Sequence, residues 1–555
     1  MKTKVILLAA MLMGCFGAAR AQGIMGGHVT GNIQLDGQMS REDTVIGADD
    51  VPEKLLMNAR ADILYTNGAF SAGLRFEMYQ NPLLGFDPQY KGQGLANYFV
   101  AYNGERLSVT AGNFYDQFGS GMILRAYEDR YLGLDNALLG FNIQYRPVNG
   151  VVLKALAGKQ RIYWGYGDGL VRGIDGEVSL NSVIKALNDS KFRMTLGAGF
   201  VSKYEADENI VFPDNPEYRL NLPLNVGAGA VRMDLGYGRW NLQAEYARKG
   251  QDPSIMNNYI YRPGEALMLN LTYSQRGFSA NVQAKHVDNM SFKTVRSQTG
   301  EMLYINYIPA INKQHTYAFL SMYPYATQVA GENGVQADLM YRIKKDTWLG
   351  GKYGTDIHLN GSVITGLDTS YIGGAGTDGY TASWTSFGEL YYADISLEVA
   401  RKLSKSVKLT ATYAYQLFNP VVEGHASDLY HNHVVVADVS WKINKKHSLR
   451  FEGEWMGSDS RYDPAHGHTD RRAGDWIMGL VEWNIGTHWF VSASDQYAYN
   501  DGIGNYYNLS VGYTLGASRF QLGYGKQREG LLCIGGVCRQ VPASNGLTFS
   551  LTTSF

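Results

Sequence analysis

The feature that most constrains this chain is an alternation of side chains, which begins in the stretch GHVTGNIQLDGQM, residues 27–39. A period of two residues predicts a β-strand with two different faces. The apolar face either packs on a protein core, as in a sandwich, or meets lipid, as in a membrane barrel. The apolar or small positions are Val29, Gly31, Ile33, Leu35, Gly37 and Met39, and the polar ones are His28, Thr30, Asn32, Gln34, Asp36 and Gln38.

The next residues repeat the pattern as a hairpin, because 57–65 and 70–78 alternate in the same way around the turn signal Asn67-Gly68. Charged side chains occupy the middle of the polar face in these strands and in a later one. A sandwich would hardly carry charge so evenly on its outer face, so we expect the apolar face to meet lipid and the charges to face a lumen. The expected lumenal residues are Arg60, Asp62, Arg75, Glu77, Arg450 and Glu452.

Connections between the predicted strands alternate in length. Short turns on one rim and long loops on the other are typical of outer-membrane barrels. We therefore predict an all-β, closed antiparallel transmembrane β-barrel over residues 22–555, with short periplasmic turns and long extracellular loops. The short connections fall near 67–68, 103–105, 148–150, 188–190, 236–238, 275–277, 344–346, 402–405, 444–446, 486–487 and 516–518, and the longer ones at 40–54, 81–93, 115–139, 204–222, 249–263, 360–386, 418–429, 457–474 and 528–544.

The strand number must be even if both termini lie on the short-turn side. The segment MLYINYIPAINKQHTYAFLSMYPYATQ, residues 302–328, is predicted to supply two strands divided at Pro309–Gln314. The total is then about 26 strands, within a range of roughly 24–28. Since an empty barrel of this size would leak, we expect the segments 112–140, 204–222 and 360–386 to fill the lumen.

The N-terminus has the pattern of an export signal over residues 1–21. Lys2 and Lys4 precede the apolar run VILLAAMLMG, and Ala19-Arg20-Ala21 offers a cleavage site before Gln22. An alternative interpretation makes Cys15 the acylated residue of a lipoprotein signal. If Cys15 is removed, the mature chain keeps two cysteines in CIGGVC, and an even count after export predicts a disulfide between Cys533 and Cys538.

The C-terminal stretch NGLTFSLTTSF places Leu547, Phe549, Leu551, Thr553 and Phe555 on one face. An amphipathic last strand that ends in Phe resembles the signal that outer-membrane barrels present to their insertion machinery. This resemblance implies that Phe555 is an assembly signal and that the partners are the lipid bilayer and the insertion machinery. It also implies the outer membrane of a Gram-negative bacterium as the location.

The segment 112–140 is unusual for an exterior loop, because it mixes many large apolar side chains with charges of both signs. Folded into the lumen, it would bury the apolar groups and set charges across the pore, which resembles the constriction loop of a porin. The alternative is an outward cap or a partner-binding surface. The candidate constriction residues are Asp116, Arg125, Glu128, Asp129, Arg130 and Asp135.

Several classes of function find no support in the sequence. The net charge of −1 gives no basic excess for nucleic acid, and no Walker A, HExxH or GxSxG motif is present, so we expect neither a cofactor nor enzymatic activity. One loop offers a weak constellation for a divalent metal, although the spacing fits a solvated surface loop better. Its residues are Asp463, His466, His468 and Asp470.

The segments FGSGMILRAYEDRYLGLDNALLG (118–140) and YINYIPAINKQHTYAF (304–319) resemble an uncharacterised family of large outer-membrane barrels from Bacteroidota. The resemblance covers nearly the whole mature chain and implies fold and location but no established activity. We expect a porin-like channel for small polar solutes. The alternatives are a non-conducting scaffold or secretion component that binds envelope partners, and an export channel that opens at a seam between the first and last strands.

Overall fold

The computed structural model describes residues 26–555 except 213–214, 373–378, 426–427, 500–502 and 535–536. The predicted signal peptide, residues 1–21, and Cys15 lie outside the described residues. Nearly all regular structure in the described part is β-strand, as predicted. No helix in that part is long and apolar enough to cross a membrane.

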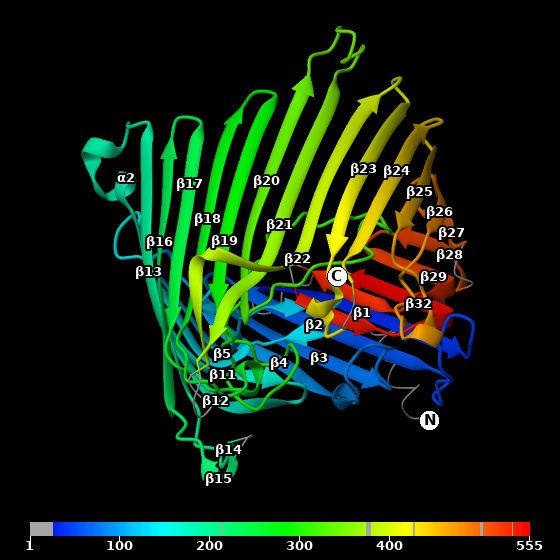
Figure 1. Ribbon diagram of the computed structural model, residues 1–555. Helices are drawn as coiled ribbons and strands as arrows, with labels where there is room; N and C mark the ends of the chain where they lie inside the picture. Colours follow the sequence, from blue (N-terminus) through cyan, green and yellow to red (C-terminus); the bar gives the residue numbers. More distant parts are fainter. Residues whose placement is uncertain (1–25, 213–214, 373–378, 426–427, 500–502, 535–536) are drawn as a thin grey trace.

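Twenty-four antiparallel strands form one closed barrel, in which each strand pairs with its neighbours along the chain (Figure 1). The last strand pairs with the first through ten residue pairs, from Asn32↔Ser554 to Arg41↔Asn545. The barrel strands are β1 (His28–Arg41), β2 (Leu56–Asn67), β3 (Phe70–Gln80), β4 (Gly92–Asn103), β5 (Leu107–Phe114), β10 (Leu138–Tyr145), β11 (Val151–Ile162), β12 (Gly165–Ser179), β13 (Phe192–Tyr204), β16 (Asn225–Tyr237), β17 (Trp240–Lys249), β18 (Gly264–Gln275), β19 (Phe278–Asp288), β20 (Gly331–Ile343), β21 (Thr355–Tyr371), β22 (Tyr380–Lys402), β23 (Val407–Phe418), β24 (Tyr430–Lys442), β25 (His447–Ser458), β26 (Trp476–Ile485), β27 (Trp489–Ala498), β28 (Gly504–Leu515), β29 (Ser518–Gln527) and β32 (Ser544–Ser554).

Shorter elements lie in the connections. Within the described residues these are β6 (Gln117–Phe118), β7 (Leu124–Arg125), β8 (Glu128–Asp129), β9 (Leu134–Asp135), β14 (Val211–Phe212), β15 (Asn215–Arg219), β30 (Gly530–Ile534), β31 (Val537–Val541), the helix α2 (Leu180–Val183) and the 3-10 turns η1 (Pro88–Tyr90), η2 (Lys185–Leu187), η3 (Ile255–Asn257), η4 (Pro420–Glu423) and η5 (Pro464–His466). All eleven predicted short turns fall between consecutive barrel strands, and Figure 1 shows those between β16 and β25 at the top.

The prediction of two strands within 302–328 is wrong. The chain leaves the wall after β19 and re-enters it at β20, and the residues between them, 289–330, contribute no strand to the barrel. We call residues 289–330 the plug segment. Without the two extra strands the barrel has 24, which is even and lies within the predicted range. The physical reason is that apolar side chains on the inner wall offer the plug segment the burial that lipid offers a strand.

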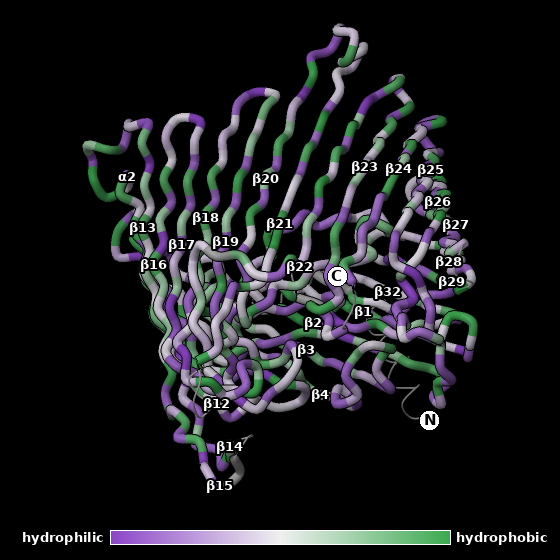
Figure 2. Tube along the Cα trace, in the orientation of Figure 1, coloured by the Kyte–Doolittle hydropathy of each residue, from purple (hydrophilic) through white to green (hydrophobic). Residues whose placement is uncertain are grey.

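The outer face of the wall is a belt of exposed apolar side chains. Figure 2 shows hydrophobic and hydrophilic residues in alternation along the strands. Val100, Phe141 and Ile174 are each at least 60% exposed, in positions where soluble proteins seldom leave so many large apolar groups. Exposed tryptophans such as Trp240 and Trp489 stand at the short-turn ends of their strands, as expected for an interfacial girdle.

The inner face changes character along each strand, and β16 illustrates the change. Val226, Ala228 and Ala230 are buried near the long-loop end, whereas Arg232 and Asp234 continue the same face toward the short-turn end. Apolar inner residues of this kind pack against residues 115–137, which we call the inner loop, and against the plug segment. The two segments therefore fill the lumen where the inner wall is apolar.

Two other segments that we expected inside the barrel behave differently. The segment 204–222 carries the small hairpin β14–β15, which projects beyond the rim at the bottom of Figure 1. Residues 360–371 and 380–386 belong to the long strands β21 and β22 and fill no lumen. The expectation is wrong for 360–371, for 380–386 and for the β14–β15 hairpin, because cross-strand hydrogen bonds satisfy their backbones without lumenal packing. At the start of 204–222, by contrast, the buried Glu205 carboxylate accepts from the backbone N–H of Arg296 in the plug segment at 2.7 Å.

Candidate functional site

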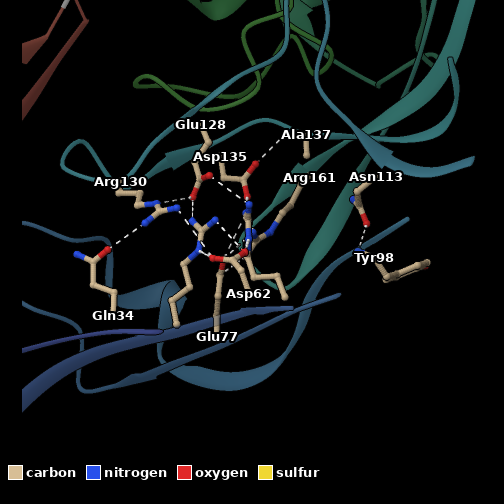
Figure 3. Close-up of polar contacts among 12 residues, drawn as sticks. Gln34, Asp62, Glu77, Tyr98, Asn113, Glu128, Arg130, Asp135, Ala137 and Arg161 are labelled. Atoms are coloured by element: carbon tan, nitrogen blue, oxygen red, sulfur yellow. Dashed lines mark hydrogen bonds and ion pairs between the residues drawn. The ribbon is translucent and has the colours of Figure 1, made fainter. Parts of the chain in front are cut away.

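The inner loop is attached to the barrel wall by a cluster of buried charges (Figure 3). Arg161, at the end of β11, donates to Glu77 on β3 at 2.6 Å and to Asp135 of the inner loop at 2.5 Å. Arg75 donates to the same Asp135 carboxylate at 3.0 Å. These four residues are at most 8% exposed, so each charge depends on its partners rather than on water.

A second group of ion pairs extends this cluster toward the lumen. Arg60 donates to Asp62 at 2.5 Å and forms an ion pair with Glu128 of the inner loop, which also accepts from Arg75 at 3.2 Å. Arg130 donates to Gln34 on β1 at 3.1 Å. The predicted lumenal residues of β2 and β3 thus meet predicted constriction residues directly.

The other predicted constriction residues have different surroundings. Asp116 pairs with Lys154 at 2.6 Å, and the guanidinium of Arg125 lies 4.3 Å from the ring centre of Tyr127 and 4.0 Å from that of Tyr307. Asp129 accepts from two backbone N–H groups of its own loop, those of Tyr131 and Leu132, at 3.0 Å. All six candidates are therefore engaged in contacts that fix the inner loop.

Tyr115 adds a neutral member to the buried charge cluster. Its hydroxyl donates to Asp135 at 2.9 Å and accepts from Arg75 at 3.2 Å. Burial, reinforced by the negative charge of Asp135, raises the pKa of the Tyr115 phenol, so the group stays a hydrogen-bond donor at neutral pH.

The plug segment is held by polar groups of the wall as well as by apolar packing. Glu454 on β25 accepts from the backbone N–H groups of Ala318 and Phe319, both at 2.9 Å, and Lys285 on β19 donates to the Pro309 carbonyl at 2.8 Å. Around these contacts its Phe319, Leu320, Met322, Tyr323 and Tyr325 join a buried cluster with inner-wall residues from β22 to β28. The plug segment is therefore packed against the inner wall on that side.

Arg450 and Glu452 lie on the inner wall, where the sequence placed them. Arg450 donates to Asp438 at 2.8 Å and to Glu482 at 3.0 Å, and it forms an ion pair with Glu452. Tyr317 of the plug segment approaches the same Asp438 at 3.5 Å. This network supports the wall beneath the plug segment.

One sector of the inner wall remains polar along its whole length and borders open space. A cavity of about 700 Å³ lies between this sector and the inner loop, whose Glu128, Asp129, Arg130 and Asp135 also line it. Along β29 it extends from Gln527 to Arg519, a span of roughly 26 Å at about 3.3 Å per residue. Its wall residues include Gln34, Asp36, Gln38, Asn58, Arg60, Arg519, Gln521, Gln527, Thr548, Ser550 and Thr552.

A second cavity of about 410 Å³ adjoins the first, since Gln527 and Val541 line both. Inward residues of β27, β28 and β29 form its wall, and Ser321 and Met322 of the plug segment form the opposite side. A third cavity of about 600 Å³, toward the long-loop end, shares Arg472 and Glu529 with the second. We call the 700 and 410 Å³ cavities together the side passage.

The weak metal constellation does not converge in the structure. His466 and Asp463 contact each other at 2.6 Å but are 79% and 44% exposed, and Asp470 is bound to Arg472 at 2.9 Å. His468 reaches Asp463 only through backbone hydrogen bonds. No group of three or more His, Cys, Asp or Glu side chains among the described residues is arranged to hold a metal ion.

The remaining predicted residues lie near chain connections. The backbones of Cys533 and Cys538 pair directly across the β30–β31 ribbon, while their side chains lie outside the described part, so the disulfide stays a prediction. Phe555 exchanges backbone hydrogen bonds with Gly31 at 2.9 and 3.0 Å, and its ring covers that glycine. The last residue thus completes the seam of the barrel, and its role as an assembly signal stays a prediction.

Sequence reasoning missed three parts of this site: the plug segment, Arg161, and the basic residues of the side passage. Arg161 belongs to LAGKQRI, where Gln160 and Arg161 are both buried and the alternation ends, so periodicity gave no orientation. A run of Tyr, Met and Phe without charge in 317–325 was the available signal for the plug segment, because wall strands elsewhere carry a polar residue at nearly every second position.

The comparisons with known proteins supply no activity for this chain. Among solved structures, the chain is similar to the ferric enterobactin receptor PfeA of Pseudomonas aeruginosa, with 11% identity, 95% of this chain and 80% of that chain covered, and a TM-score of 0.44. OccK9 (OpdG) of Pseudomonas aeruginosa is 13% identical, with 75% of this chain and 99% of that chain covered and a TM-score of 0.37. A BenF-like porin from Pseudomonas fluorescens Pf-5 is 8% identical, with 78% of this chain and 94% of that chain covered and a TM-score of 0.28. These likenesses concern the fold of the barrel alone.

A search of curated proteins finds no match. A family model, by contrast, matches residues 1–555, which is the whole chain. The chain belongs to the family of unknown function DUF6029.

Proposed function

We propose that this protein is an outer-membrane transport barrel that lets small polar solutes cross through the side passage. The observation that carries the proposal is the 700 Å³ cavity, which follows the inner face of β29 from Gln527 to Arg519. That span is roughly 26 Å along the strand at about 3.3 Å per residue. At the tilt of about 40° typical of such barrels it projects to about 20 Å along the membrane normal, most of the apolar band of about 25 Å.

The division of the inner wall supports the same function. Where the inner wall is apolar, the inner loop and the plug segment cover it and exclude water. Where it is polar, from β27 through β32 to β2, the cavities adjoin it and hydroxyl and amide groups face the open space. A path lined by such groups replaces part of the hydration of a polar solute, which is what selective passage requires.

A second candidate function is a non-conducting barrel that acts as a scaffold or secretion component. It is favoured by the extent of the lumenal packing, because two separate apolar clusters seal the plug segment and the inner loop to the wall. In this alternative the cavities hold ordered water and no solute moves through them. The two functions differ in one measurable property, the conductance of the purified protein.

The deciding experiment places a large side chain in the side passage. Ser550→Trp introduces an indole into the 700 Å³ cavity, whereas Leu551→Trp alters the next residue of β32, which points to the outer apolar belt. In planar bilayers we expect stepwise conductance from the wild-type protein, a loss of at least several-fold in Ser550→Trp, and wild-type steps from Leu551→Trp. Absence of steps from correctly folded wild type would support the scaffold, and full conductance in Ser550→Trp would exclude the side passage as the route.

A further inference from the structure

An arginine that forms no ion pair with any described residue lines the 410 Å³ cavity, which it shares with the carboxylate of Glu529. Arg528 follows β29 directly and lines this cavity together with Arg472, Tyr506 and Gln496. Its guanidinium lies 5.5 Å from the ring centre of Trp476, which supports one side of the group without neutralising it. The side chain is therefore held by an aromatic contact at the edge of this cavity.

The neighbouring cations differ from Arg528, because they have acidic partners. Arg472 binds Glu423 at 2.5 Å and Asp470 at 2.9 Å, and Lys526 binds Asp43 at 2.8 Å. Arg528 has no ion pair with any described residue, and its Nη1 is buried without a hydrogen-bond partner there. A buried guanidinium group left in this state loses hydration that nothing in the described structure replaces.

A second polar group in the same cavity also lacks a partner. Tyr506 on β28 is 2% exposed, and its hydroxyl makes no hydrogen bond among the described residues. A phenol hydroxyl and a guanidinium are both hydrogen-bond donors, and they line one enclosed space. Donors without acceptors at the edge of a cavity point to a ligand that brings the acceptors.

We propose that the 410 Å³ cavity is a binding site for a small anion, whose carboxylate or phosphate oxygens accept from Arg528 and Tyr506. If solutes cross through the side passage, this site makes small anions the class of solute that is transported, and that transport role rests on the function proposed above. Anion binding itself does not depend on transport. Guanidinium is the side chain best suited to these groups, because its planar set of donors matches two oxygens at once.

The electrostatics around Arg528 fit this assignment. Burial, together with the positive charge of Arg472, lowers the pKa of Arg528 to about 10. An anion bound against the guanidinium would oppose this lowering of the pKa, because its negative charge favours the protonated form. Two further arginines, Arg519 and Arg539, line the adjoining cavity without an ion pair among the described residues, although Asp129 lies close enough to act on the charge of Arg539.

The test measures binding to the purified full-length protein in detergent by calorimetry, with inorganic phosphate and succinate as separate probes. Arg528→Gln should weaken whichever probe binds by about 10- to 100-fold, the loss expected for hydrogen bonds between charged groups. Tyr506→Phe should weaken it by about tenfold. Arg276→Gln is the matched control, since it removes the same charge from the short turn between β18 and β19, outside the side passage, and should leave the affinity unchanged.

A stability measurement keeps the result interpretable if a variant behaves unexpectedly. Arg528→Gln removes an uncompensated charge, so its thermal transition without anion should lie at or above that of the wild type. Saturating phosphate or succinate should raise the transition of the wild type and not that of Arg528→Gln.

The site is excluded if neither probe binds the wild type, or if Arg528→Gln binds as tightly as the wild type or the control. Anion binding in a protein that never conducts would exclude the transport proposal and leave the site in place. Conductance without anion binding would exclude the anion site and leave the transport proposal in place. The failures of the two proposals are therefore distinguishable.

Discussion

At the scale of single residues, the lumenal charges act mainly on one another. Arg161 illustrates this, because it is 3% exposed and binds both Glu77 and Asp135, one from the wall and one from the inner loop. In a low-dielectric environment, removing one member of such an ion pair costs stability, because its partner stays buried and charged. Replacing all members of the cluster with apolar side chains would change the free energy of unfolding much less. These ion pairs define where the inner loop sits, and through it the inner side of the 700 Å³ cavity.

The Arg161→Met substitution tests this role. It leaves the carboxylates of Glu77 and Asp135 buried with one partner fewer, so we expect the free energy of unfolding to fall by about 3–5 kcal/mol. Urea unfolding in detergent micelles, followed by tryptophan fluorescence, gives this value.

The control for this substitution is Arg519→Met, a lumenal arginine without an acidic partner among the described residues, which should change stability by less than about 1 kcal/mol. Adding Glu77→Met to Arg161→Met should recover part of the loss. Equal stability of Arg161→Met and wild type would show that the cluster does not hold the inner loop.

At the scale of elements, the barrel depends on close approach of strands at its seam. Gly546 on β32 lies against β1 so closely that a Cβ there would stand 1.9 Å from the carbonyl oxygen of Met39. On the opposite face of the same seam, the rings of Phe549 and Phe555 cover Gly37 and Gly31. Glycine is therefore required on both faces of the closing strand pair. On the inner face Gly546 lies against the backbone of β1, and on the outer face Gly31 and Gly37 lie under aromatic rings of β32 and the C-terminal residue.

Gly546→Ala should consequently weaken the seam. The methyl group meets backbone rather than a movable side chain, so we expect a loss of about 1–3 kcal/mol and a lower temperature for loss of the compact barrel band on unheated gels. Gly453→Ala is the matched control, because a Cβ at Gly453, mid-strand on β25, meets nothing within 4 Å. Identical melting of the two variants would contradict this account of closure.

At the scale of the whole molecule, the plug segment decides whether a barrel of 24 strands is a pore or a closed wall. Barrels of 16 to 18 strands already enclose a water-filled channel. Here the plug segment and the inner loop occupy the apolar part of the lumen and leave the side passage along the polar part.

Replacing residues 291–328 with a short Gly-Ser linker should raise the single-channel conductance at least tenfold over the wild type, because the lumen loses its largest insert. The same variant should be less stable, since inner-wall residues such as Val434 and Met456 lose their cover. Planar bilayer recording measures the first effect and urea unfolding the second.

The control replaces 209–219, part of the hairpin segment at the rim, and should change neither property much. Unchanged conductance after removal of 291–328 would mean that the plug segment does not limit passage.

Local signals were sufficient for much of the wall. Asn67-Gly68 marked a hairpin that the structure contains, and Arg60 and Arg450 lie on the inner face as the alternation required. The same reasoning failed at 302–328, because Tyr, Met and Phe suit either lipid or an apolar inner wall. It also failed to separate engaged charges from free ones: Asp116 and Arg528 look alike as isolated charges in a sequence, yet the first is paired and the second is not.

The sequence by itself determined the closed wall, the positions of the short turns and the even strand number, because lipid on one side and water on the other impose a choice at every second residue. Only the tertiary structure decided which segments enter the lumen, which charges neutralise one another and where open space remains. These properties depend on contacts between residues far apart in the chain, such as Arg161 with Glu77 or Glu454 with Phe319, and no local period encodes them.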